Sequence, residues 1–339
     1  MKILIISNLR PNKSGITEQV YNIRRGLIEE SHDISLISTY GTIFKRLKGI
    51  AQAFKEAFKS DLVIGTGCAF YGFLPVAVAS IAAYFADKPV FYNFHDGQAE
   101  VFLKKSERLV KFFIRNKKVV VASEFVNEVF KKFKFNSELI PNIFDFNSFP
   151  KRESEFAWNK KIIWARSFEN IYQPELALKI ALKTLEKSDC EFHFYGDGSL
   201  YENLKKKYRH TGIIFHGLVV REQILKDLSE SSVFLNTTLY DNMPNSFFES
   251  GFYKLLVLST RVGGVATTFD DSEVVFAKDN GINSFTEVLS DILENPLKYD
   301  SYRINLNDKV LRYTWDKVKD KWLSLINESV KKINNIYLN

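Results

Sequence analysis

The chain has 339 residues, a length that suits two compact domains of roughly 150 residues each better than one. Apolar residues make up 45% and charged residues 26%, an ordinary globular balance that excludes long disordered stretches. The two cysteines, Cys68 and Cys190, lie far apart and outside any CxxC spacing, which excludes a disulfide scaffold and a zinc cluster and fits a reducing cytosol.

The net charge of +7 lies entirely in the first half of the chain. Residues 1–150 hold 21 basic and 14 acidic side chains, whereas residues 151–339 hold 26 of each. Within the first half, residues 104–118 carry seven basic side chains and one acidic side chain. Such a patch can face nucleic acid, an anionic membrane surface or only solvent. No helix-turn-helix or RNA-binding motif occurs, so we expect no nucleic acid partner.

Short apolar runs of strand length alternate with helical patterns along the first 150 residues. The first run, residues 2–7, is too short for a signal-peptide core and precedes an amphipathic helix over residues 17–30. Further strands are expected at residues 33–38, 62–64, 89–93 and 119–122. This repetition predicts a parallel sheet with helices on both faces.

Residues 62–86 contain no charged side chain, and that length is sufficient to cross a bilayer. Three glycines and Pro75 interrupt the segment, dividing it into a short strand, a turn and a helix over residues 74–85. A buried strand and helix of an α/β domain explain it better, so we predict no transmembrane helix.

The alternating pattern begins again after residues 146–159, which contain polar residues and proline without periodicity and predict a linker. Strands are expected at residues 161–165, 191–195, 213–215, 233–236 and 256–260. The sequence therefore predicts two doubly wound, Rossmann-like α/β domains that face each other across a cleft. Ligands of such sheets bind beyond the carboxyl ends of the strands, at the switch point of strand order.

Polar residues gather in the segment that follows the expected strand at residues 233–236. Pro244 suits the first turn of a helix, and the backbone amides of Asn245 and Ser246 would then point out of its N-terminus. A helix N-terminus carries a partial positive charge and binds phosphate. The segment therefore predicts a phosphate site.

Two carboxylates flank this helix start. Glu249, one turn into the helix, can accept hydrogen bonds from a ribose diol, and Asp241 in the loop can reach the hydroxyls of a transferred sugar. The alternative for Asp241 is that it only caps the helix. The segment resembles retaining glycosyltransferase family 4, in which two glutamates are separated by seven residues and a Gly-Gly turn follows, as Gly263 and Gly264 do here.

The resemblance assigns the diphosphate to Arg166, at the end of the expected strand over residues 161–165. A guanidinium suits bidentate phosphate contact. The family usually has a lysine a few residues later, and residues 167–175 contain none. Because Asp241 is one methylene shorter than the family's glutamate, we expect the sugar contacts to shift or to pass to the backbone amides of Asn242 and Met243.

Further motifs of the family occur in the same order along this chain. The sequence Ser14-Gly15-Ile16 stands where the family has a Gly-Gly loop near the donor phosphates, and His95 resembles a strand-end histidine that faces the donor sugar. Gly196 belongs to a strand-end Gly-x-Gly, and His216-Gly217 lies where the nucleotide base is commonly held.

The resemblance implies a GT-B fold in which residues 1–150 form the acceptor-side domain and residues 151–312 the donor domain, with residues 313–339 crossing back as a helix. It implies transfer of a sugar from a UDP- or GDP-linked donor to a hydroxyl acceptor with retention, in bacterial surface polysaccharide, lipopolysaccharide or glycolipid assembly. His95, Arg166 and Asp241 are then the catalytic residues. No D-x-D triplet occurs, so we expect no metal and no other cofactor, with charge neutralised by Arg166 and backbone dipoles.

Two alternative functions stay open at the level of sequence. The same fold serves nucleotide-sugar epimerases, and the missing lysine and the aspartate also suit a non-catalytic nucleotide-sugar binding protein. For location, we predict a cytoplasmic protein that binds reversibly to the inner face of a membrane, where a lipid-linked rather than a free saccharide acceptor would lie. Residues 44–59 and 101–118 motivate this because each mixes apolar and basic residues at helical spacing. The competing explanation is that both apolar faces pack on the sheet.

Overall fold

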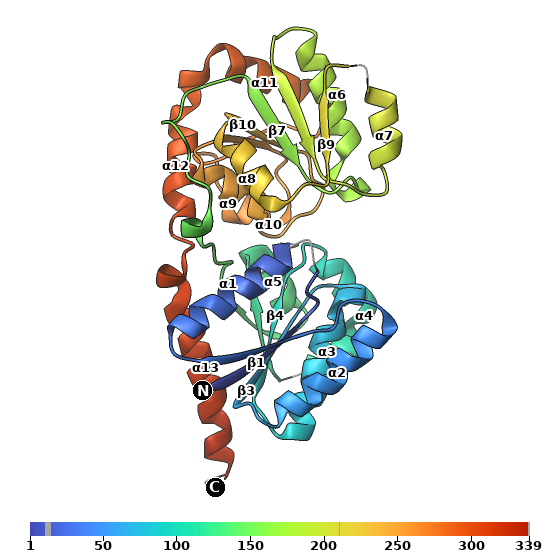
Figure 1. The fold of residues 1–339 in the computed structure, drawn as a ribbon, viewed down its shortest axis with the longest axis vertical. Helices are drawn as coiled ribbons and strands as arrows, with labels where there is room; N and C mark the ends of the chain where they lie inside the picture. The colour runs from blue at the N-terminus through green and yellow to red at the C-terminus, as the bar shows by residue number, and fades with distance from the viewer. Residues whose placement is uncertain (11–14, 115, 210, 338–339) are drawn as a thin grey trace. The chain divides into compact units, whose positions relative to one another are not determined.

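The computed structural model describes residues 1–10, 15–114, 116–209 and 211–337 (Figure 1). Ser14 of the predicted glycine loop therefore lies outside the described residues. The chain divides into two compact units. Unit 1 comprises Met1–Asp145 and Tyr313–Asn339, and unit 2 comprises Phe146–Arg312.

Unit 1 is built on a six-stranded parallel sheet with the strand order β2-β1-β3-β4-β5-β6. The strands are β1 (Lys2–Ser7), β2 (Asp33–Ser38), β3 (Leu62–Gly67), β4 (Val90–Phe94), β5 (Lys118–Val121) and β6 (Asn136–Leu139). The central strands are apolar on both faces, as a sheet covered on both sides requires.

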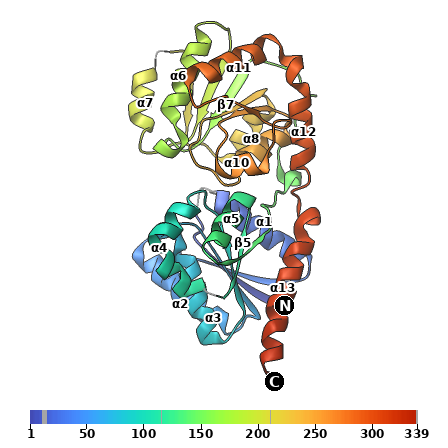
Figure 2. The same cartoon turned by 180° about the vertical axis from the view of Figure 1, so that it is seen from behind.

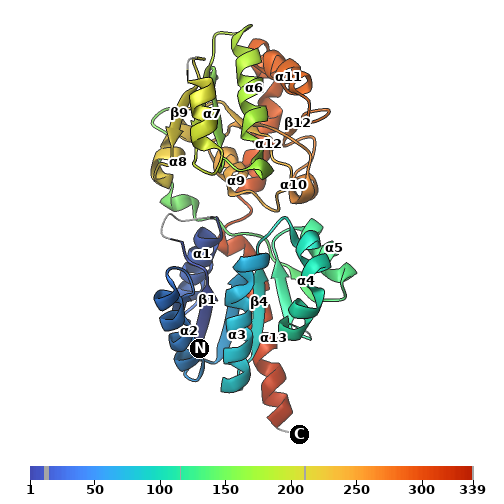
Figure 3. The ribbon, with the colours of Figure 1, turned by 90° about the vertical axis from the view of Figure 1, so that its right-hand side faces the viewer.

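Two groups of helices cover the two faces of this sheet. One face carries α2 (Ile43–Ala57), α3 (Leu74–Ala86), α4 (Ala99–Ile114) and α5 (Glu124–Lys132). The other carries α1 (Gly15–Glu29) and α13 (Trp315–Tyr337). Figure 3 shows α2, α3 and α4 side by side on their face.

The C-terminal helix belongs to the core of unit 1. Trp315 and Trp322 of α13 pack with Ile3, Ile5 and Phe91 in one buried cluster. Gly26 of α1 makes this possible, since a Cβ there would lie 2.1 Å from the Trp315 ring.

Unit 2 repeats the architecture with the strand order β12-β11-β10-β7-β8-β9, and all its strand pairs are parallel. Its strands are β7 (Lys161–Ala165), β8 (Glu191–Tyr195), β9 (Ile214–Gly217), β10 (Val233–Asn236), β11 (Leu256–Ser259) and β12 (Val275–Phe276). Its helices are α6 (Pro174–Leu185), α7 (Tyr201–Tyr208), α8 (Arg221–Ser229), α9 (Asn245–Phe252), α10 (Gly263–Thr268), α11 (Ile282–Glu294) and α12 (Asp300–Val310). Figure 2 shows α6 and α11 side by side, as their contacts require.

The doubly wound α/β prediction is confirmed in both units. Two strands were not predicted: β6, with the polar sequence Asn-Ser-Glu-Leu, and β12, with two residues. Both are edge strands, which have only one neighbour and bury less apolar surface.

The segment predicted as a linker, residues 146–159, begins where the chain enters unit 2. The segment begins with a short 3-10 helix, η2 (Phe146–Ser148), and its phenylalanines anchor it to unit 2. The Phe146 ring stacks on Phe252 of α9 at 4.8 Å, and the Phe149 ring meets Phe252 edge-on at 5.2 Å. Burial of these rings, which the absence of periodicity concealed, fixes the start of the segment.

Residues 62–86 form β3, the 3-10 helix η1 (Phe70–Phe73) and α3, as predicted. Among the described residues, no helix combines the length and apolar character needed to span a bilayer.

Candidate functional site

The predicted donor residues of unit 2 lie in loops at one edge of its sheet. Arg166 directly follows β7, Gly196 follows β8, and Asp241 lies in the loop after β10. Because β10, β7 and β8 are adjacent and parallel, their carboxyl ends share an edge. This edge is where a doubly wound sheet binds ligands.

Side chains from three strand ends hold Arg166 in place. Its Nε donates to Asn236 Oδ1 at 3.2 Å, and Asn236 Nδ2 donates in turn to Ser259 Oγ at 2.9 Å. The guanidinium also lies over the Tyr172 ring, 5.4 Å from its centre. A fixed guanidinium loses little conformational entropy when an anion binds.

Arg166 and Asp241 form an ion pair in the same place. Arg166 Nη2 lies 2.8 Å from Asp241 Oδ2, and the two side chains are 12% and 16% exposed. The contact is outside hydrogen-bond geometry, so both buried atoms keep their hydrogen-bonding capacity in the described structure. The pair therefore presents one donor and one acceptor to a ligand.

The Gly-Gly turn predicted from sequence packs against the Asp241 loop. Gly264 N donates to the Asp241 carbonyl at 2.9 Å, and a Cβ on Gly264 would lie 1.9 Å from the Asn242 carbonyl oxygen. The Asn242 amide donates to Asp241 Oδ1 at 2.9 Å in this structure, and its contact with the sugar stays a prediction. Met243 places its side chain in the core.

The N-terminus of α9 lacks a side-chain cap. Pro244 is the N-cap residue rather than part of the first turn, and it has no side chain that accepts a hydrogen bond, so Asp241 does not cap this helix. Ser246 Oγ is buried without a hydrogen-bond partner in the described structure, and Asn245 opens the helix. An uncapped helix start next to an unsatisfied hydroxyl suits an anion.

Glu249 has a partner that sequence reasoning missed. The buried carboxylate receives two hydrogen bonds at Oε1, from Arg221 Nε at 2.9 Å and from Nη2 at 2.8 Å. Arg221 also lies over the Phe149 ring, 5.0 Å from its centre. The sequence offered only a general indication of this pair, because a buried carboxylate requires a cationic partner.

Gly196 is a position where only glycine fits. Its φ is +123°, and a Cβ there would lie 2.0 Å from the Arg166 carbonyl oxygen. Its amide donates to the Gly217 carbonyl at 2.9 Å, and Gly217 also has a positive φ, +69°. The close approach connects the ends of β7, β8 and β9.

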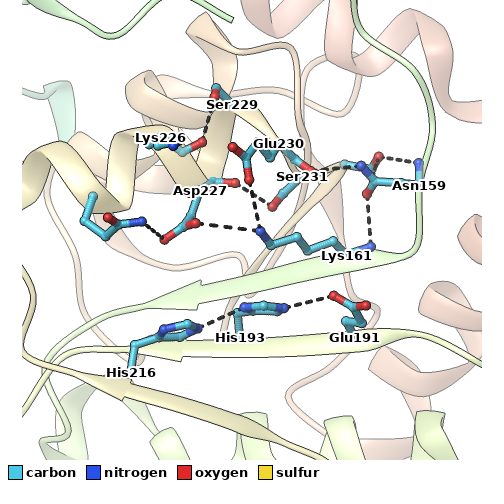
Figure 4. Close-up of polar contacts among 12 residues, drawn as sticks. Asn159, Lys161, Glu191, His193, His216, Lys226, Asp227, Ser229, Glu230 and Ser231 are labelled. Carbon is cyan, nitrogen blue, oxygen red and sulfur yellow. Dashed lines mark hydrogen bonds and ion pairs between the residues drawn. The ribbon is translucent and has the colours of Figure 1, made fainter. Parts of the chain in front are cut away.

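His216 belongs to a row of side chains along the sheet (Figure 4). Its Nε2 lies 2.9 Å from His193 Nδ1, and His193 Nε2 lies 3.2 Å from Glu191 Oε2. Its ring stacks on Tyr195 at 4.1 Å. Burial lowers the pKa of both histidines, and the positive charge of nearby Lys161 lowers both pKa values further. His216 is nonetheless exposed, so the prediction that this loop holds the nucleotide base stays a prediction.

A second group of charges lies beside this row in Figure 4. Lys161 Nζ lies 3.7 Å from Asp227 Oδ1 and 3.8 Å from Glu230 Oε2. The Tyr195 hydroxyl donates to Asp227 Oδ2 at 2.8 Å, and burial together with this carboxylate raises the pKa of Tyr195. These contacts join α8 to the sheet.

His95 lies in unit 1, directly after β4. Its backbone amide donates to the Gly67 carbonyl at 2.9 Å, and its Nε2 is buried with no hydrogen-bond partner in the described structure. Burial lowers the pKa of His95 to about 4, so the ring is neutral at pH 7. Gly15, the other predicted site residue of this unit, is the exposed first residue of α1.

The part of the chain that the structure describes contains no group of three or more histidine, cysteine, aspartate or glutamate side chains arranged to hold a metal ion.

The strand-end residues of unit 2 lie within a segment that resembles a known protein family. Residues 159–295 match the family model described as glycosyl transferases group 1. A curated relative, poly(ribitol-phosphate) alpha-N-acetylglucosaminyltransferase of Staphylococcus aureus (strain COL), is 21% identical over 246 residues. That match covers 69% of this chain, and the chain spans about half the relative's length, 48%.

Solved structures share the fold over nearly the whole chain. HepE from Anabaena in complex with UDP-glucose has a TM-score of 0.77 at 14% identity, covering 97% of this chain and 100% of that one. Sucrose-phosphate synthase from Thermosynechococcus elongatus has a TM-score of 0.76 at 12% identity, covering 97% and 98%. The chain therefore has a GT-B fold, and residues 159–295 of unit 2 resemble the glycosyl transferases group 1 family.

Proposed function

We propose that the chain is a glycosyltransferase that binds a nucleoside diphosphate sugar at the carboxyl edge of the unit 2 sheet and transfers the sugar, with retention, to a hydroxyl group. The acceptor is a saccharide or a lipid-linked saccharide of a bacterial surface polysaccharide, lipopolysaccharide or glycolipid. Among its structural relatives, HepE was solved with UDP-glucose and TarM with UDP and alpha-GlcNAc-glycerol, which favours UDP as the nucleotide here.

The Arg166–Asp241 pair is the observation that carries this proposal. In a nucleoside diphosphate sugar, an anionic phosphate and the hydroxyls of the sugar are neighbours. The pair offers a cationic donor and an anionic acceptor 2.8 Å apart, each with unused hydrogen-bonding capacity. A ligand with that chemistry satisfies both atoms at once.

Because the lysine that is usual in the family is absent, other groups must neutralise part of the negative charge of the diphosphate. The guanidinium of Arg166 faces the Tyr172 ring on one side rather than a second cation. The N-terminus of α9, whose N-cap residue makes no side-chain cap, and the unsatisfied Ser246 hydroxyl supply the remaining donors. Phosphate binding thus rests on one cation and one helix end.

The nucleoside is assigned to the Glu249 side of the site. Because Arg221 binds Oε1 with both nitrogens, Oε2 of Glu249 is left to accept from the ribose diol. The base is expected against the loop after β9, where His216, Leu218 and Val220 are exposed. Exposed aliphatic side chains suit the face of a base.

The reaction is a front-face displacement without a protein nucleophile. The bond between the anomeric carbon and the diphosphate oxygen breaks, the acceptor oxygen forms its bond on the same face, and the acceptor proton passes to the leaving phosphate. Arg166 and the α9 amides stabilise the negative charge on that phosphate. Neutral His95 is proposed as a hydrogen-bonding partner of the donor sugar, a role its low pKa permits at pH 7. The reaction is proposed to need no metal ion.

The test measures binding and turnover separately. Binding of UDP, GDP and their sugar conjugates is followed by thermal shift, since a bound ligand raises the apparent stability. Arg166→Ala is expected to abolish the shift and to lower turnover by roughly 10²-fold. Arg209→Ala, which removes an exposed arginine of the same unit, is the matched control and should change neither. Equal binding to Arg166→Ala and the wild type would refute the site.

Product analysis separates the alternatives. A transferase releases nucleoside diphosphate only when an acceptor is consumed, and nuclear magnetic resonance of the product reports its anomeric configuration. An epimerase interconverts two sugar nucleotides without an acceptor, and a binding protein gives a thermal shift without product. Full activity after treatment with EDTA is expected, and loss of activity that added divalent ions restore would contradict the metal-free reaction.

A further inference from the structure

One face of unit 1 exposes large apolar side chains. The helices α2, α3 and α4 lie side by side over the sheet, α3 in the middle (Figures 1 and 3). The most exposed aromatic side chains of α2, α3 and α4 are Phe44, Tyr84 and Phe112, at 85%, 82% and 81%. In unit 2, by contrast, Tyr240 is the exposed aromatic residue among those described. We name the surface of these three helices the α2–α4 face.

The outer surface of α2 carries two parallel stripes. Phe44, Leu47, Ala51 and Phe58 follow one another at intervals of three, four and seven residues and are exposed. Lys45, Lys48, Lys55 and Lys59 follow one another at intervals of three, seven and four residues and form the second, basic stripe beside it. The buried residues Gly49, Ala53 and Ala57 form a third side, which packs inward. The apolar stripe is therefore not needed for the core.

The middle helix adds an uncharged surface. α3 contains no charged residue, and Ile81, Tyr84 and Phe85 point away from the core. The Phe85 ring meets Phe54 of α2 at 6.2 Å, which joins the apolar stripe of α2 to that of α3. On α4, Leu109 and Phe112 are exposed, while Phe113 packs on Phe73. The apolar surface thus continues across neighbouring helices.

The charges around this surface are not neutralised on α2. Lys45, Lys48 and Lys55 have no acidic partner among the described residues. On α4, Lys104 pairs with Glu100 at 3.0 Å and Lys111 pairs with Glu107. Lys104 and Lys111 of the basic cluster expected from residues 104–118 are therefore compensated, whereas Lys105 and Arg108 stay exposed, so the available positive charge lies on both α2 and α4.

We propose that the α2–α4 face binds the surface of an anionic lipid bilayer. Exposed aromatic side chains insert at the level of the headgroups, and unpaired lysines beside them attract the anionic lipids. A protein partner would have to place acidic groups beside the lysines and apolar groups beside the apolar stripes. A bilayer of anionic lipids presents both kinds of group over its whole surface. The proposal concerns binding alone and does not depend on the transfer reaction.

Vesicle flotation of the full chain tests the proposal. Vesicles of phosphatidylcholine alone are compared with vesicles that also contain phosphatidylglycerol, at low and at high salt. Lys45→Glu, Lys48→Glu and Lys55→Glu are combined in one variant. Because each lysine near an anionic surface contributes a factor of about five, binding should fall by at least about 100-fold.

The matched control changes three exposed lysines of α13, which packs on the opposite face of the same sheet. Lys317→Glu, Lys321→Glu and Lys331→Glu together alter the net charge equally and should leave binding unchanged. A second variant combines Phe44→Ser, Tyr84→Ser and Phe112→Ser, with Leu297→Ser of unit 2 as its control. Exposed positions are chosen so that the variants keep the wild-type melting temperature.

The outcomes separate the possible occupants of the face. Salt-sensitive flotation with phosphatidylglycerol, lost in both α2–α4 variants and kept in both controls, supports the proposal. No flotation of the wild type at low salt overturns it. Equal loss in the α13 control overturns it as well, because net charge alone would then explain binding. Self-association that the aromatic variant abolishes, without vesicle binding, assigns the face to a second copy of the chain and also overturns it.

Discussion

Protonation of His95 should destabilise unit 1 in mild acid. The ring has a pKa near 6.5 when unfolded and about 4 when folded, because burial disfavours the charged form. Between these values the unfolded chain binds a proton that the folded chain does not, so the free energy of unfolding falls as the pH falls. The difference corresponds to about 3 kcal/mol at most, and about 2 kcal/mol if the part of the ring that water reaches is discounted.

Urea unfolding of the wild type and of His95→Gln at pH 7 and pH 4.5 measures this effect. Other histidines with lowered pKa values, such as His193 and His216, titrate in both proteins, so their contributions cancel in the difference. Hydrogen exchange of the β4 amides provides a local reading, since the His95 amide bonds to the end of β3. The wild type should lose about 2–3 kcal/mol more than the variant.

Two results would refute this reasoning. Equal losses of stability in both proteins would mean that the ring is not held neutral by burial. A titration of the His95 ring protons with a midpoint above pH 6 would also show that burial does not hold the ring neutral. Either result would also remove the basis for a neutral His95 in the proposed reaction.

Further predictions concern unit 2. Asp241→Asn should tighten the binding of UDP by about tenfold, because it removes a carboxylate next to the phosphate-binding arginine, and should slow turnover; calorimetry that shows weaker UDP binding would contradict this. Arg221→Ala should destabilise the protein by about 3 kcal/mol, because it leaves the buried Glu249 carboxylate without its cationic partner. In a double-mutant cycle, adding Glu249→Gln should restore much of this stability, and additive losses would argue against the ion pair. Gly264→Ala should weaken donor binding, since its Cβ would displace the Asn242 carbonyl; unchanged affinity would separate this turn from the site.

The fold was predictable because its strands are apolar on both faces and short. Periodicity alone placed ten strands within a few residues of their observed bounds. The two strands it missed, β6 and β12, are edge strands whose residues are polar or few, so no apolar run marks them. The anchoring of Phe146 and Phe149 escaped for a related reason: their partner, Phe252, lies about one hundred residues away.

The site was predictable in its residues but not in its pairings. Spacing between Asp241, Glu249 and the Gly-Gly turn singled out the loop, whereas the partner of Glu249 is Arg221, at a separation of 28 residues that no local pattern marks. The orientation of His216 depends on an irregularity in the register of β8 and β9, which pairs Tyr195 with Gly217. Side-chain direction at such a bulge follows from the strand pairing and not from the sequence of either strand.

The return of the chain to unit 1 has a consequence for the order in which the protein is made. Unit 2 is continuous in sequence, so all its residues have been synthesised once Arg312 is in place. Unit 1 lacks Trp315 and Trp322 until the residues that follow unit 2 are added, and without them the apolar residues Ile3, Ile5 and Phe91 of its sheet lose part of their cover. Residues 1–145 are therefore synthesised before unit 2 but complete their core after it, and during that interval the open sheet face is a surface that chaperones can recognise.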